Sequence, residues 1–145
     1  MTEIHVYLGV FEFGDDPQVV TDLLGIAPTK AWAAGTLMPG KAGERGGRWP
    51  HERWELVSPA GREASVEDQL LALLPLLEAR ADALAEASRR FEVGLACAAY
   101  FHEVNPGFRL DAALLRRIAA LGLDFDFDLY CLGTDDDEAG HDAAG

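Results

Sequence analysis

The sequence has few cysteines, few cations and no long apolar run. Cys97 and Cys131 are its two cysteines, and both fall in apolar alternating patterns, where a reduced thiol behaves as a small hydrophobic side chain. No apolar stretch approaches the ~20 residues that cross a bilayer. No basic segment followed by an apolar one precedes Ile4. We therefore expect a cytoplasmic protein with buried free thiols and no membrane partner.

The shortage of cations gives the chain a large negative charge. Twelve Lys and Arg residues stand against 25 Asp and Glu residues, for a formal net charge of −13. Such a charge repels phosphate backbones, so we expect no nucleic acid partner. It attracts basic protein surfaces and speeds their association at low salt. A basic protein partner and a simple requirement for solubility both explain the charge.

Motifs of the common catalytic and cofactor sites are also missing. The chain has no G-x-S-x-G elbow, no H-E-x-x-H helix and no C-x-x-C pair. Gly35, Gly40 and Lys41 match the start of a phosphate-binding loop, but Ala42 replaces the Ser or Thr that holds magnesium. We therefore favour a non-enzymatic protein and expect neither a cofactor nor a metal.

Two parts of the chain share a pattern of strand, capped helix and glycine. An alternating apolar run over 4–13 leads through Asp16-Pro17 into a short helix that ends at Gly25. A second run over 91–101 leads through Asp111 into a helix that ends at Gly122. A further strand, 123–131, follows the second glycine.

Between these repeats we expect a strand at 54–57 and a long helix at 65–90 that Pro75 kinks or divides. The order predicts an α+β fold, a ferredoxin-like antiparallel sheet from two βαβ repeats with an extra long helix between them. In that topology the strand 123–131 lies beside the strand 4–13. We expect a single domain over residues 1–133 and an acidic disordered tail over residues 134–145.

The segment 30–54 differs from the rest in charge and aromatic content. It holds five Lys or Arg against two Glu, together with all three tryptophans. Arginine binds planar anions, and tryptophan faces hold rings or cations. An anionic or aromatic ligand could bind here through Trp32, Arg48, Trp49, Arg53 and Trp54. The alternative is that the tryptophans only fasten a long loop over the core.

Aspartates alternate along the strand 123–131. Asp124, Asp126 and Asp128 share one face, because side chains at every second position of a strand point the same way. Charges on an edge strand oppose sheet-to-sheet aggregation. The same three residues are our candidates for binding a basic partner.

The motifs of the chain resemble a known family. The run from Leu23 to Trp32, the later Trp54-Glu55-Leu56 and the segment from Leu121 to Tyr130 are similar to the bacterial domain-of-unknown-function family 4279. The resemblance covers nearly the whole chain up to Leu132. The family name implies no activity and no catalytic residues.

Two hypotheses for the function follow. The first is a non-enzymatic protein-binding module, of the immunity type that occupies a basic toxin through an acidic surface. The second is a small-ligand module or unrecognised enzyme with its site in the segment 30–54. A homodimer is a further possibility, because a one-sided sheet leaves Tyr7, Tyr100 and Tyr130 on its free face.

Overall fold

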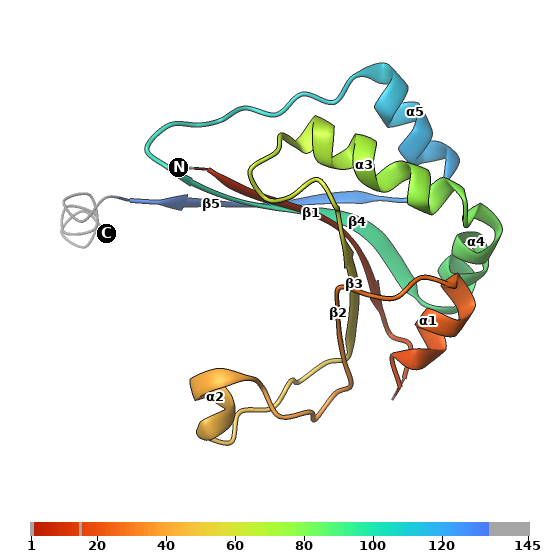
Figure 1. Ribbon diagram of the computed structural model, residues 1–145, viewed down its shortest axis with the longest axis vertical. Helices are drawn as coiled ribbons and strands as arrows, with labels where there is room; N and C mark the ends of the chain where they lie inside the picture. Colours follow the sequence, from red (N-terminus) through yellow and green to blue (C-terminus); the bar gives the residue numbers. More distant parts are fainter. Residues whose placement is uncertain (1, 15, 134–145) are drawn as a thin grey trace.

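The computed structural model describes residues 2–14 and 16–133 and shows one sheet with helices on one of its faces (Figure 1). The strands lie in the spatial order β2-β3-β1-β4-β5. Neighbouring strands are antiparallel except β4 and β5, which run parallel. The strand bounds are β1 (Glu3–Phe11), β2 (Lys30–Trp32), β3 (Arg53–Val57), β4 (Glu92–His102) and β5 (Phe125–Leu132).

Four helices form the layer that covers the sheet, and the core lies between the two layers (Figure 1). These helices are α1 (Gln18–Leu24), α3 (Val66–Glu78), α4 (Ala81–Arg90) and α5 (Ala112–Ala120). A short fifth helix, α2 (Gly40–Glu44), lies away from the sheet in an arm formed by residues 33–52 (Figure 1). Within the described residues, no helix is long and apolar enough to cross a membrane.

The helix ends follow from local side chains. The Ser65 hydroxyl accepts a hydrogen bond from the Asp68 amide, and the Asp111 carboxylate accepts one from the Leu114 amide. Such caps satisfy amide groups that have no partner within the first helical turn. Gly25, with φ of 70°, ends α1 in the left-handed conformation. The predicted starts of α3 and α5 and the predicted end of α1 are thus confirmed.

The α+β class and the one-sided helix layer are confirmed, but the ferredoxin-like antiparallel topology is not. The sheet is mixed, and β5 lies beside β4 instead of beside β1. The reason is that β4 pairs with the whole length of β1, from Glu3 opposite Tyr100 to Phe11 opposite Glu92. The other edge of β1 is paired with β3, so β1 has no free edge for β5.

The predicted long helix is divided into α3 and α4. Pro75 lies inside α3 and does not end it. The break comes at Arg80, whose φ of −120° departs from helical geometry. The segment expected as a long loop also contains the short elements β2 and α2. The predicted acidic tail, residues 134–145, lies outside the described residues. Both thiols were expected to be buried, which is correct for Cys97 and wrong for Cys131, because Cys131 lies on the edge strand β5 and is exposed.

One buried polar side chain joins the helix layer to the sheet. Gln69 on α3 is 1% exposed. Its carbonyl oxygen accepts a hydrogen bond from the Val6 amide, and its amide nitrogen donates to the carbonyl oxygens of Ile4 and Ala64. Beyond Val57, where β3 ends, Gln69 therefore supplies the partners of two backbone groups of β1, the Val6 N–H and the Ile4 C=O.

Candidate binding site on the open sheet face

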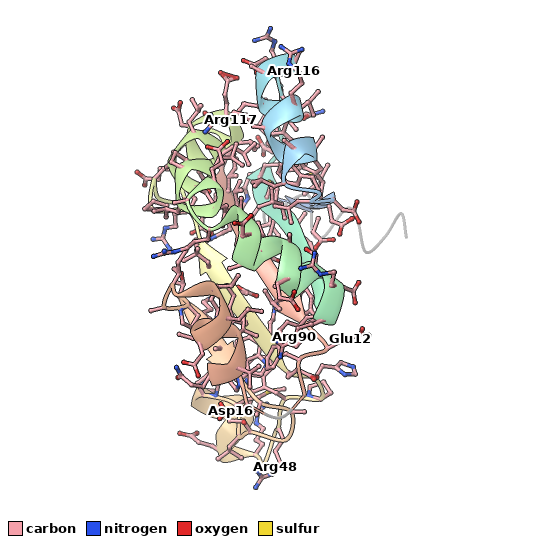
Figure 2. The ribbon with its side chains drawn as sticks, turned by 90° about the vertical axis from the view of Figure 1, so that its right-hand side faces the viewer. Glu12, Asp16, Arg48, Arg90, Arg116 and Arg117 are labelled. Atoms are coloured by element: carbon pink, nitrogen blue, oxygen red, sulfur yellow. The ribbon has the colours of Figure 1, made fainter. Side chains whose placement is uncertain are left out.

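The face of the sheet opposite the helices carries the candidate site. In Figure 1 the four covering helices lie on one side of the strands, and no described helix covers the other. Figure 2 views the molecule from the helix side, with Arg48 in the arm at one end and Arg116 of α5 at the other. We call the uncovered side the open face.

Small residues form the floor of the open face. Gly94, Ala96 and Ala98 of β4 occupy alternate positions and therefore share a face. They lie opposite Gly9, Tyr7 and His5 of β1 in the sheet register. A strand of small residues between strands with bulky side chains leaves a groove along its length.

The groove contains a cavity of about 220 Å³ over Gly94 and Ala96. One wall comes from β1 and β3, with Tyr7, Phe11 and Arg53. The opposite wall and one end are carboxylates: Glu92, Asp124, Asp126 and Asp128. Four carboxylates and one guanidinium thus line this space, which we call the acidic cavity.

Arg53 is held in the wall by three neighbours. Its Nη2 atom donates a hydrogen bond of 2.9 Å to the Tyr7 hydroxyl, and its Nε atom forms an ion pair with the Glu55 carboxylate. The guanidinium carbon lies 5.2 Å from the centre of the Phe11 ring and 5.6 Å from that of Tyr7. Its side chain is 33% exposed, so a ligand can still reach it.

Glycine at position 9 makes this aromatic wall possible. A Cβ atom on Gly9 would lie 3.0 Å from two atoms of the Phe11 ring, closer than side-chain atoms ordinarily approach. The Phe11 ring can therefore lie against the strand backbone and beneath the Arg53 guanidinium.

A second cavity of about 230 Å³ lies on the other side of Arg53. It is lined by the two tyrosines Tyr7 and Tyr100. Its charged residues are the cations Lys30 and Arg53 and the carboxylate Glu55. Tyr100, one of the two tyrosines, stacks on Tyr130 at a centroid distance of 4.9 Å. We call this space the basic cavity, because its cations outnumber its carboxylates.

Two groups on the central strands β1 and β4 have shifted pKa values. Burial raises the pKa of the Tyr7 hydroxyl, against the opposing influence of the Arg53 charge. Burial also raises the pKa of the Cys97 thiol to about 11, with a smaller contribution from the negative charge of Asp128. Both groups therefore stay protonated at neutral pH and are poor nucleophiles or bases.

The structure separates the five residues of the predicted tryptophan and arginine site. Arg53 lines both cavities. Trp54, the next residue, points to the helix side, is fully buried and donates a hydrogen bond to the Thr21 hydroxyl. The predicted five residues therefore do not surround one space.

The other three residues lie in or beside the arm. Trp32 and Trp49 stack at a centroid distance of 4.0 Å, and the Trp32 indole donates to the His51 carbonyl oxygen. Arg48 donates to the Gly35 carbonyl oxygen. These contacts fasten the two chain segments that enter and leave the arm to each other.

The structure brings Arg53 together with the aspartates of β5, although the sequence offered them as alternative sites. Asp126 and Asp128 lie opposite Ala96 and Ala98 in the register. They do not converge on a point: among residues 2–14 and 16–133, no group of three or more His, Cys, Asp or Glu side chains could hold a metal ion.

The floor and the aromatic wall of the groove were not among the features predicted from the sequence. The available signal was the alternation of Gly94, Ala96 and Ala98 in an otherwise bulky strand. Polar or β-branched side chains usually occupy the solvent-facing side of a strand. Three small residues on the solvent-facing side of a strand therefore indicate a groove in the face of the sheet.

These observations define the class of the protein: an α+β protein whose mixed sheet carries helices on one face and a groove on the open face. A family model, Domain of unknown function (DUF4279), matches residues 2–132, and the chain belongs to that family. No curated protein and no solved structure matches the chain.

Proposed function

We propose that this protein is a non-enzymatic binding module of the bacterial cytoplasm, possessing an acidic site for a basic protein partner in the manner of an immunity protein. The observation that carries the proposal is the row of carboxylates along the groove. Glu92, Asp124, Asp126 and Asp128 face one guanidinium across the acidic cavity, a net charge of −3.

Charge and shape act together in this proposal. The carboxylates lie beside a hollow with a small-residue floor, so a lysine or arginine side chain of the partner can enter between Asp126 and the aromatic wall. A guanidinium binds a carboxylate through paired, charge-assisted hydrogen bonds. The surrounding negative potential speeds the encounter, and salt weakens it.

The experiment compares three purified proteins as affinity baits for extracts of the host. The baits are the natural chain, the variant Asp124→Lys/Asp126→Lys/Asp128→Lys, and a control with the same change in charge. The control, Asp22→Lys/Glu44→Lys/Asp82→Lys, changes exposed residues of α1, α2 and α4 that line neither the acidic nor the basic cavity. Each captured protein is then purified and its dissociation constant measured at low and high salt.

We call Asp124→Lys/Asp126→Lys/Asp128→Lys the β5 variant, because two of its changes lie in β5 and the third directly precedes it. We expect a basic protein that binds the natural chain and the control, is released by salt, and binds the β5 variant at least about tenfold more weakly. Capture of the same proteins by all three baits, with equal dissociation constants, would contradict the proposal.

A small-ligand module is the second candidate function, and the basic cavity is the observation that favours it. Lys30 and Arg53 lie there beside two tyrosine rings, a combination suited to an aromatic anion. A metabolite screen by thermal shift tests this candidate. Ligands of this site should stabilise the natural chain and lose their effect on Lys30→Ala, while Lys41→Ala in the arm serves as the control.

A further inference from the structure

The edge strand β5 is exposed on more than one side. It is hydrogen-bonded to β4, and within the described part of the chain no strand pairs with its outer edge. Every residue of β5 from Asp126 to Leu132 is exposed to solvent. The outer edge therefore presents backbone N–H and C=O groups that can pair with another strand.

The two faces of β5 differ in chemistry. Asp126 and Asp128 lie on the open face, in register with Ala96 and Ala98. Phe127 and Leu129 point to the helix side, yet they are 39% and 54% exposed. A partner at this strand would therefore meet carboxylates on one face, apolar side chains on the other face, and unpaired backbone groups along the outer edge.

A second copy of the chain does not satisfy this edge. In a symmetric antiparallel pairing of two β5 strands, the aspartates of both copies would lie on the same face. Like charges opposite each other destabilise a strand pair, and two chains of net charge −13 repel one another. The complement is a strand with cations at alternate positions.

We propose that β5 binds its partner by strand addition: an extended segment of a basic protein pairs with the outer edge of β5. Its lysines or arginines lie beside Asp126 and Asp128, and its alternating apolar side chains cover Phe127 and Leu129. Backbone hydrogen bonds provide affinity and the alternating side chains provide specificity, as in other cases of strand addition. This inference rests on the proposed function for the basic character of the partner.

Four synthetic peptides, each as long as the eight residues of β5, test the proposal. The first alternates lysine and valine, and the second has the same composition with the lysines in one block. The third and fourth repeat the alternating sequence with backbone N-methyl groups on every lysine or on every valine. Because alternate residues of an added strand direct their N–H groups to β5, one of these two methylation patterns blocks pairing.

Binding is measured by NMR titration of the isotope-labelled protein. We expect the alternating peptide to shift the amide signals of β5 and to bind about tenfold more tightly than the block peptide. One methylated peptide should lose at least about tenfold in affinity and the other should bind nearly normally. Leu129→Lys should weaken binding of the alternating peptide, while Leu115→Lys on α5, also an exposed leucine, should not.

Equal binding of all four peptides, abolished by Asp124→Lys/Asp126→Lys/Asp128→Lys, would overturn strand addition and leave the acidic site of the proposed function standing. No binding by any peptide overturns strand addition. If the affinity capture also retains the same proteins on the β5 variant, the proposed function fails as well. Concentration-dependent dimers of the free protein, abolished by Leu129→Lys, would assign the edge to a second copy and overturn the proposal.

Discussion

Arg53 and Glu55 form an ion pair on the open face, two positions apart on β3. The Glu55 side chain is only 10% exposed, whereas the Arg53 side chain is 33% exposed. Removing the cation therefore leaves a nearly buried carboxylate without its opposite charge. We expect Arg53→Met to lower the free energy of unfolding by about 2 kcal/mol, less than a fully buried pair would lose, because water still reaches Arg53.

The double variant Arg53→Met/Glu55→Gln is the control for this loss. Since it removes both charges, its stability should lie closer to that of the natural chain than the stability of Arg53→Met does. Urea unfolding of the three proteins measures the difference. A double variant that is less stable than the single one would show that the charge on Glu55 is not the cause.

Local features could be predicted from the sequence, and distant pairings could not. Ser65, Asp111 and Gly25 fix helix ends through contacts within a few residues, so their patterns suffice. The order of the strands depends on β4 pairing with the whole of β1, a contact between segments about ninety residues apart. Nothing in the pattern of either strand specifies that choice over a pairing of β1 with β5.

The candidate site shows the same division. The sequence predicts Arg53 and Trp54 in one site because both lie in the basic, tryptophan-rich segment 30–54, but successive side chains of a strand point to opposite faces. Asp126 and Asp128 share a face for the same reason of alternation, and the structure confirms the strand that carries them. That Arg53 faces these aspartates follows only from the order β3-β1-β4-β5.

The side-chain amide of Gln69 should be essential for stability. In Gln69→Leu the Val6 N–H and the Ile4 C=O lose the partners that they have in the core. An unsatisfied buried polar group costs about 1–3 kcal/mol, so we expect a loss of about 3 kcal/mol or more. Urea unfolding measures the loss, and Gln18→Leu on the exposed surface should change stability by less than about 0.5 kcal/mol. Equal stabilities of the two variants would contradict this explanation.

The conformation of the arm should depend on the absence of a side chain at Gly43. A Cβ atom there would lie 1.7 Å from the Met38 carbonyl oxygen, so Gly43→Ala must displace α2. We expect weaker tryptophan exciton circular dichroism from the Trp32–Trp49 stack and faster proteolysis in residues 33–52.

The sheet should be nearly unaffected by this change, because α2 lies away from it (Figure 1). Lys41→Ala, an exposed change in the same helix, is the control and should leave both signals unchanged. If Gly43→Ala is cleaved no faster than this control, the close approach of Met38 does not govern the fold of the arm.

Cys97 should make the stability of the protein depend on alkaline pH. The thiol pKa is about 11 in the folded chain against a reference value of 9.0. Below pH 9 both states hold the proton and stability is constant. Between pH 9 and pH 11 the unfolded chain loses the proton that the folded chain keeps, so stability falls by on the order of 1 kcal/mol per pH unit. Urea unfolding across this range should show a smaller slope for Cys97→Ala than for the natural chain. Equal slopes in Cys97→Ala and the natural chain would show that Cys97 ionises as readily in the folded state as in the unfolded one.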